Sequence, residues 1–217
     1  MSNVLTEGFA FDAEKHEYRL GSQIVPACTQ VLSSGGLVDW SYVSRDTLER
    51  RSELGKAVHK ACHLHNIDRL GKYDLAVKPH LHAWIYFKER CHNFKLISSE
   101  QVTIGYVNGL PFGMTVDCNA IVDGWDTIIE LKIGEMLPHH AIQTAGYAAG
   151  LPLDDKAIKT PFGRFLARRR IGVQLRENGQ PKVHKFEERS DFEVFASVLY
   201  TAGWKRRHES YYREENI

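Results

Sequence analysis

The feature that most constrains the fold is a run of three strand-like segments separated by two short turns. Residues 96–107, 112–122 and 127–133 are rich in β-branched and aromatic side chains, which favour strands. The turns contain Asn108-Gly109 and Asp123-Gly124, and both dipeptides readily adopt the positive φ angles of tight hairpins. We therefore expect three consecutive antiparallel strands.

Helical patterns surround these strands. Apolar residues return at helical spacing over 41–66 and 79–93, and the helical segment 141–150 is rich in small residues that allow close packing on a sheet. The flanking segments predict a hairpin over 9–25, a short helix over 26–32, a hairpin over 170–187 and a last helix capped by Ser190 and Glu193. This order predicts a mixed α/β fold with a central mixed sheet flanked by helices. We expect one domain over 1–217, made of an N-terminal segment (1–40), a core (41–150) and a C-terminal hairpin and helix (151–217).

Composition narrows the class of protein. The 217 residues are 43% hydrophobic and 25% charged, and no apolar run approaches the roughly 18 residues of a membrane span. Acidic residues in the first 20 positions argue against a secretory signal or a transit peptide. The four cysteines, Cys28, Cys62, Cys91 and Cys118, show no CxxC spacing, so we expect reduced thiols and no iron–sulfur cluster. These features predict a cytoplasmic protein without a membrane partner.

Charged residues interrupt the last of the three apolar strands, where Glu130 and Lys132 alternate with apolar neighbours. If Val122 pairs with Thr127 across the turn, Asp117 lies opposite Lys132, and the period of two places both on the face of Glu130. Two carboxylates and an ammonium would then lie within roughly 5–8 Å of one another. A Mg²⁺ or Mn²⁺ ion would turn the repulsion between the carboxylates into ligation; a salt-bridged, solvated sheet face is the alternative.

Several short motifs resemble those of one enzyme family. Asp117 followed by Glu130-Leu131-Lys132 resembles the PD-(D/E)XK nuclease signature, with Val116 in place of the usual proline. Gly55-Lys-Ala-Val-His59 resembles the GxxxH motif of RecB-type nucleases, and Gln143-Thr-Ala-Gly-Tyr147 resembles their QxxxY motif. Gly113, four residues before Asp117, also fits this group. The segments around Tyr18 and Thr29 are similar to phage-encoded members and to mitochondrial genome maintenance exonuclease.

The resemblance implies a restriction-endonuclease-like core and a metal-dependent deoxyribonuclease. It implies that one or two Mg²⁺ or Mn²⁺ ions are held by His59, Asp117, Glu130 and the Leu131 carbonyl, with Glu100 near a second ion. Lys132 would position or deprotonate the attacking water, and Gln143 and Tyr147 would orient the site and the DNA strand. The residues themselves add a basic cluster, Arg164, Arg168, Arg169 and Arg170, which is either a track for the DNA backbone or a solvated turn.

The resemblance favours a stand-alone exonuclease acting on DNA ends or single strands in recombination, repair or replication. It allows a homo-oligomer, and a single-strand-annealing or single-strand-binding protein as partner. Two alternatives remain open within this fold: a structure-specific endonuclease, and a DNA-binding or assembly protein without turnover. A nuclease that acts on RNA is a third alternative, because no residue in the sequence can be assigned to recognition of a 2′-hydroxyl.

Overall fold

The structure is a computed structural model that describes residues 8–39, 45–153 and 157–208. The expected start of the first long helix at Ser41 and the last nine residues of the C-terminal segment lie outside the described residues, as does the side chain of Leu48.

Five strands form a mixed central sheet in the order β4-β5-β6-β7-β8. Their bounds are β4 (Phe94–Val107), β5 (Leu110–Val122), β6 (Trp125–Lys132), β7 (Arg169–Leu175) and β8 (Pro181–Lys185). Neighbouring strands are antiparallel except β6 and β7, which are parallel. Because parallel neighbours need a long crossover, the chain between them passes through two helices. The predicted central mixed sheet with flanking helices is confirmed.

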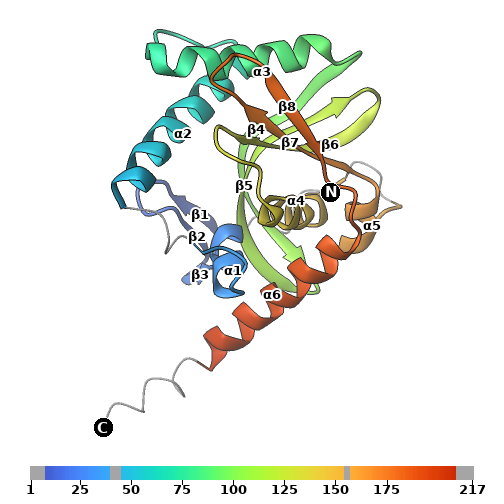
Figure 1. The fold of residues 1–217 in the computed structure, drawn as a ribbon. Helices are drawn as coiled ribbons and strands as arrows, with labels where there is room; N and C mark the ends of the chain where they lie inside the picture. The colour runs from blue at the N-terminus through green and yellow to red at the C-terminus, as the bar shows by residue number, and fades with distance from the viewer. Residues whose placement is uncertain (1–7, 40–44, 154–156, 209–217) are drawn as a thin grey trace.

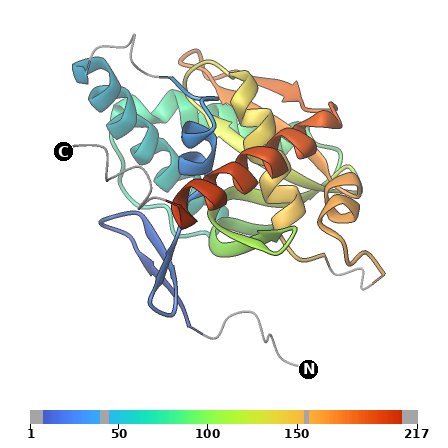
Figure 2. The ribbon, with the colours of Figure 1, turned by 90° about the horizontal axis from the view of Figure 1, so that it is seen from below.

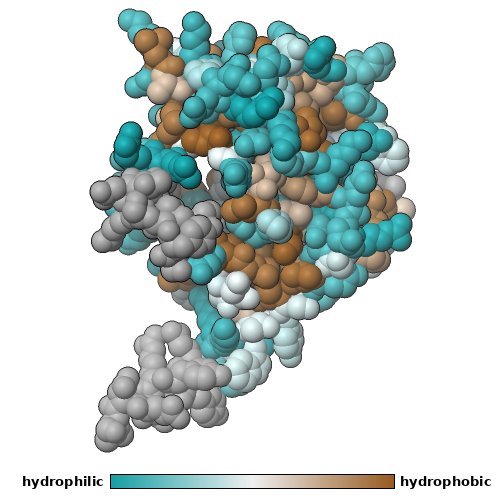
Figure 3. All heavy atoms as spheres, in the orientation of Figure 1, coloured by the Kyte–Doolittle hydropathy of each residue, from teal (hydrophilic) through white to brown (hydrophobic). Residues whose placement is uncertain are grey.

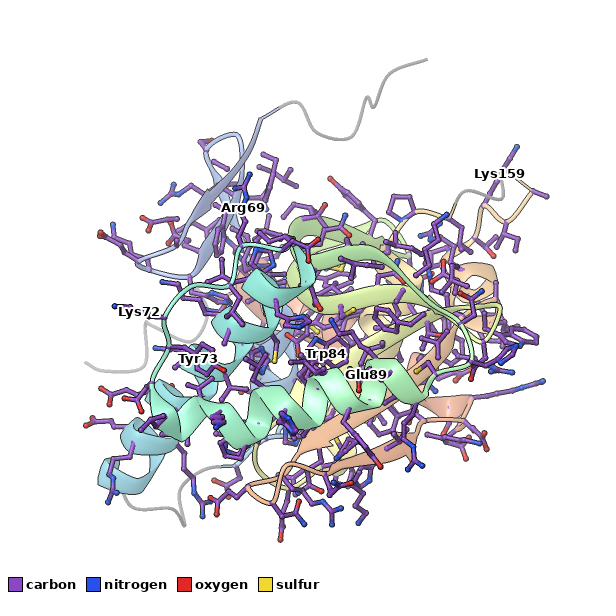
Figure 4. All side chains as sticks on the ribbon, turned by 90° about the horizontal axis from the view of Figure 1, so that it is seen from above. Arg69, Lys72, Tyr73, Trp84, Glu89 and Lys159 are labelled. Carbon is purple, nitrogen blue, oxygen red and sulfur yellow. The ribbon has the colours of Figure 1, made fainter. Side chains whose placement is uncertain are left out.

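Helices cover both faces of this sheet (Figure 1), and an apolar core lies on each side. One face carries α2 (Arg45–Asn66), the short η1 (Leu75–Val77) and α3 (Lys78–Arg90). The other carries α1 (Cys28–Ser34), α4 (Pro138–Gly150), α5 (Pro161–Leu166) and α6 (Ser190–Arg207), and Figure 2 shows α4 and α6 side by side. Figure 4 shows α3 across the sheet with Trp84 directed inward, where it is fully buried. Among the described helices, none has the length and apolar character to cross a bilayer.

The turn between β5 and β6 corrects the expected register. Asp123 and Gly124 have φ angles of 50° and 85°, and together they close the hairpin in two residues. Val122 therefore pairs with Trp125, not with Thr127. The ladder from Cys118 to Val122 is shifted by two residues, and a shift of two leaves the side chains of these paired residues on the faces they were expected to occupy.

The last helix begins differently from the expectation. Arg189, whose φ and ψ are −76° and −30°, already has helical geometry, and Ser190 is the first residue of the helix, not its N-cap. The Ser190 amide donates instead to the Glu188 carboxylate at 3.1 Å. On this helix Phe192, Phe195 and Leu199 are buried, whereas Trp204 is 39% exposed.

The N-terminal segment forms three strands instead of the expected single hairpin. These are β1 (Phe9–Asp12), β2 (Glu17–Leu20) and β3 (Gln23–Val25). The extra turn includes His16 in the left-handed region, with a φ of 51°. This small sheet places the fully buried ring of Tyr18 on Gly113, where a Cβ atom would overlap the ring. The Tyr18 hydroxyl also bonds the Thr115 hydroxyl at 2.7 Å.

This contact gives a stability prediction. Gly113→Ala should destabilise the protein by about 1–3 kcal/mol, because the added methyl group has no space beneath the ring. The free energy of unfolding in urea measures the change. Tyr18→Ala should remove most of the additional cost of Gly113→Ala. Gly71→Ala is the control, because no atom lies within 4 Å of a Cβ built there; equal effects at both glycines would contradict the prediction.

Candidate metal centre

Strand β5 is irregular at Asp117. Val116 packs in the core that includes α4, whereas Cys118, two residues further on, packs in the core that includes α2 and α3. Since side chains alternate with a period of two, these residues would share a face in a regular strand. The ladder between β5 and β6 ends at Cys118 and Ile129, and the Leu131 amide beyond it donates to the Asp117 carboxylate at 2.8 Å. An oxygen of the Asp117 side chain thus accepts a hydrogen bond from the Leu131 amide, as a backbone carbonyl of β5 would in a regular ladder.

Three ligating side chains from three elements meet at this irregularity. His59 of α2, Glu100 of β4 and Asp117 of β5 bring one potential ligand atom each within 4.8 Å of one another. His59 Nδ1 lies 3.3 Å from Glu100 Oε1 and 3.4 Å from Asp117 Oδ1. Its Nε2 lies 3.0 Å from the Leu131 carbonyl oxygen. The structure therefore brings together four of the five expected metal ligands.

Glu100 reaches this group through an unusual backbone conformation. Its φ of 50° lies in the left-handed region, within β4 and close to the register shift between Leu96 and Ser98. A non-glycine residue in this region costs of order 1 kcal/mol or more, and such residues concentrate at functional sites. The conformation turns the Glu100 carboxylate toward His59.

Glu130, the fifth expected ligand, lies beside this group and is fully buried. Its Oε1 accepts hydrogen bonds from Lys132 Nζ at 2.6 Å and from Gln143 Nε2 at 3.0 Å. Its Oε2 is buried and has no hydrogen-bond partner among the described residues. Burial and the charge of Asp117 raise the pKa of the Glu130 carboxyl to about 7. An unpartnered carboxylate oxygen in such a place is suited to a cation.

The charges of the site compensate one another. Burial lowers the pKa of the His59 imidazole, but the carboxylates of Asp117 and Glu100 outweigh burial and raise it to about 10. Burial likewise opposes the charge of Lys132, but Glu130 and Asp117 raise the pKa of its ammonium. Burial would raise the pKa of Asp117, yet His59 and Lys132 lower it. Without a metal ion, protonated His59 and Lys132 therefore balance a set of buried carboxylates.

Gln143 and Tyr147 form a support behind Glu130. Both are buried on α4, and the Gln143 amide donates to Glu130 at 3.0 Å and to the Tyr147 hydroxyl at 2.8 Å. Gln143 also lines the cleft described below, whereas Tyr147 does not. The predicted orienting role fits both residues. The predicted contact between DNA and Tyr147 does not fit its burial.

Two of the four expected DNA-binding arginines are buried. The Arg168 guanidinium donates to two carbonyls at the C-terminal end of α4, at 2.8 and 2.9 Å, and lies 3.2 Å from the Asp126 carboxylate. Arg170 pairs with Asp191 at 2.9 Å. Cations are favourable beside the last carbonyls of a helix. These arginines hold α4 in place, and the prediction that they follow a DNA backbone is wrong because they are enclosed by the fold.

The other two arginines also lie outside the metal centre. Arg164 donates to the Ala149 carbonyl at 2.7 Å, again at the end of α4, and is partly buried. Arg169 is exposed, and its guanidinium stacks 4.4 Å above the Trp125 ring. Neither lines the cleft beside His59 and Glu100. Three arginines of the basic cluster, Arg164, Arg168 and Arg170, therefore bind backbone carbonyls of α4.

A cleft of about 1260 Å³ opens onto two of the candidate metal ligands, His59 and Glu100. Its walls come from α1, α2, the segment between β6 and α4, and the end of β7. Figure 3 shows this face of the molecule hollowed beside α2. The sequence reasoning missed three exposed cations in its lining, Arg51, Lys56 and Lys60. Lys56, three residues before His59 on the same helix, could have been identified from this spacing.

Comparisons with known proteins assign no family to the chain. A scan against models of protein families found no match, and a search among curated proteins found none either. The motifs and the geometry of the site therefore support the functional argument without relatives.

Glu100 gives a prediction that separates ligation from folding. Glu100→Gly should remove a ligand yet leave the metal-free protein as stable as the parent or more stable, because glycine adopts positive φ without strain. Glu100→Ala should lose the ligand and keep the strained backbone. The free energies of unfolding of the two variants, measured in urea with a chelator present, should differ by about 1 kcal/mol. Calorimetry should show that both variants bind Mn²⁺ at least tenfold more weakly than the parent. Parental Mn²⁺ affinity in either variant would contradict the role of Glu100.

His140 gives a prediction for pH dependence. The Leu137 amide donates to its Nδ1 at 2.9 Å, so this nitrogen is unprotonated. Burial, with the charges of Lys132 and His139, lowers the pKa of His140 to about 3. Because the unfolded value is higher, about 6.5, the unfolded chain binds the proton first, and stability falls as the pH drops below 6.5.

The expected contribution of His140 is a loss of roughly 2 kcal/mol between pH 7.5 and pH 5. Urea unfolding of the metal-free protein at a series of pH values measures it. His140→Asn keeps an acceptor for the Leu137 amide and should show a flatter profile. Parallel profiles for parent and variant would contradict the assignment.

Proposed function

We propose that the protein is a divalent-metal-dependent deoxyribonuclease of the PD-(D/E)XK type, most similar in its motifs to the RecB and λ-exonuclease branch. The convergence of His59, Glu100 and Asp117 beside the buried Glu130–Lys132 pair is the observation on which the proposal rests. The sequence motifs that predicted this chemistry come from four separate segments. A solvated ion pair does not explain this arrangement, because Glu130 is fully buried and one of its oxygens has no partner among the described residues.

The donor set fits a hard divalent cation. Carboxylate and carbonyl oxygens are the ligands that Mg²⁺ and Mn²⁺ prefer, and imidazole is accepted by Mn²⁺ in particular. His59, Glu100, Asp117 and the Leu131 carbonyl would hold one ion, and the free Oε2 of Glu130 would complete its surroundings or help to hold a second ion. Such an ion, when bound, polarises a phosphate and lowers the pKa of a coordinated water.

Lys132 supplies the fixed positive charge of the proposed reaction. Its ammonium is held 2.6 Å from Glu130 and its pKa is raised, so Nζ carries its protons at neutral pH. It would orient the attacking water through a donated hydrogen bond and stabilise the charge that develops on the phosphate oxygens. Gln143 fixes Glu130 Oε1 and leaves Oε2 free for the site.

Exonuclease action on DNA follows from the resemblance of the GxxxH and QxxxY segments to end-processing enzymes. We include in the proposal a cytoplasmic location, a role in recombination, repair or replication, and assembly with a single-strand-binding or single-strand-annealing protein or with further copies of the chain. The cleft is compatible with a DNA strand, and its many histidine and cationic residues favour a polyanionic substrate.

The test is DNA degradation by the purified protein. With Mg²⁺ or Mn²⁺ the parent should degrade labelled DNA, and a chelator should abolish this. Asp117→Asn and Lys132→Ala should each lower the rate by about 10²–10⁴-fold, since each removes a charge that acts on the reacting phosphate. Lys182→Ala, an exposed lysine on β8, is the control and should retain activity. Activity in either site variant close to that of the parent would refute the proposal, and 5′- and 3′-labelled single and double strands report end preference.

A further inference from the structure

The cleft-facing side of α2 carries a stripe of cationic and small residues around His59. On a helical wheel, Ser52, Lys56, His59, Lys60 and His63 fall within about 100° of one another, and all five line the cleft. Lys56 and Lys60 are exposed, and among the described residues neither has an ion-pair partner. Two ammonium groups without an ion-pair partner in the described part of the chain thus flank His59 at the mouth of the cleft.

Gly55 adds a second, independent observation on the same helix. Glycine inside a helix costs about 1 kcal/mol relative to alanine, so it needs a reason. Packing does not supply one, because the atom nearest to a Cβ built there is Ile133 Cδ1 at 4.0 Å. Gly55 lies one turn before His59 and lines the cleft. The missing side chain therefore leaves space for something outside the described chain.

The remaining lining indicates how a strand would be recognised. Among the described lining residues none is Phe, Tyr or Trp, the side chains on which bases usually stack. The acidic lining residues are Glu100 at the metal ligands and Glu135 and Glu177 outside α2. A ligand on α2 would thus meet positive charge and an open backbone, which suits phosphates more than bases.

We propose that this stripe of α2 binds the sugar–phosphate backbone of a DNA strand independently of base sequence, with Lys56 and Lys60 pairing with phosphates and Gly55 as the point of closest approach. The two lysines stand about 6 Å apart along the helix axis. Phosphates on one DNA strand follow each other every ~3.4 Å of axis. The lysines therefore match phosphates one or two nucleotides apart. This inference rests on the proposed function for the identity of the ligand, DNA.

The experiment measures binding of fluorescein-labelled dT30 and dA30 to the full chain with a chelator, so that cleavage does not interfere. Lys56→Gln with Lys60→Gln should weaken binding at least tenfold at low salt and reduce the slope of log K against log salt by about 1.4. Lys182→Gln with Lys185→Gln removes the same charge from exposed positions on β8, outside the cleft, and should change affinity less than twofold. Equal losses in the two pairs, or no loss in the first, would overturn the proposal, as would a strong preference for one homopolymer.

The variant Gly55→Ala should change the thermal stability and the DNA affinity in opposite directions. It should raise the Tm by roughly 2–4 °C, because alanine favours the helix and has space, and at the same time weaken DNA binding about fivefold or more. A lower Tm, or unchanged binding, would count against close approach at Gly55.

The two proposals fail separately. DNA binding that depends on Lys56 and Lys60 in a protein that cleaves no DNA would refute the nuclease and leave the α2 surface standing. Metal-dependent cleavage with binding and KM unaffected by the lysine pair would refute the α2 surface alone.

Discussion

The hydrogen bond between the Asp117 carboxylate and the Leu131 amide is the interaction on which the site depends. It joins β5 and β6 where their ladder ends, and it fixes a carboxylate in a buried place between two strands. The same irregularity lets β5 pack against different helices before and after Asp117. One consequence is that the Leu131 carbonyl and the Asp117 carboxylate both face His59. The site is therefore a product of a defect in the sheet, in the way that bulges often redirect side chains at functional sites.

A chain of buried polar contacts links this defect to the opposite layer of the fold. Arg168 and Arg164 bind carbonyls at the end of α4, and Arg170 binds the Ala141 carbonyl near its beginning. The helix fixed in this way presents Gln143 to Glu130. Each partner in the chain satisfies a buried group that would otherwise cost free energy. The arginines thus act on the centre through α4 and not through contact with a substrate.

Much of the central sheet was predictable because the sequence patterns that indicate its strands and turns are local. The Asn-Gly and Asp-Gly turns fixed two hairpins, and the period-two pattern identified the three strands and the shared face of Glu130 and Lys132. The predicted register was wrong by two residues, because the sequence does not show which residues form the turn, but the paired residues Cys118–Val122 keep their predicted faces. The candidate metal ligands His59 and Glu100 were identified from motif resemblance, because no local pattern indicates a contact between residues far apart in the chain.

The failures share a physical cause, which is that tertiary partners decide the burial of polar residues. In the sequence Arg168 and Arg170 look like part of a solvent-facing cluster, but backbone carbonyls and Asp191 enclose them in the fold. The left-handed conformation of Glu100 has no signal in its residue type, since the surrounding strands impose it. The turn between β1 and β2 was missed because it contains no glycine, and His16 adopts the positive φ instead.

The candidate ligands at positions 59, 100 and 117 lie on a helix and two strands that meet only in the folded chain. An unfolded polypeptide holds them too far apart to chelate, so an ion would bind the native state almost exclusively. Its binding free energy would then be added to the free energy required to detach α2 from the sheet. Amide hydrogen exchange along α2 would consequently slow as the ion concentration rises, and the resistance of this helix to proteases would depend on cellular metal supply.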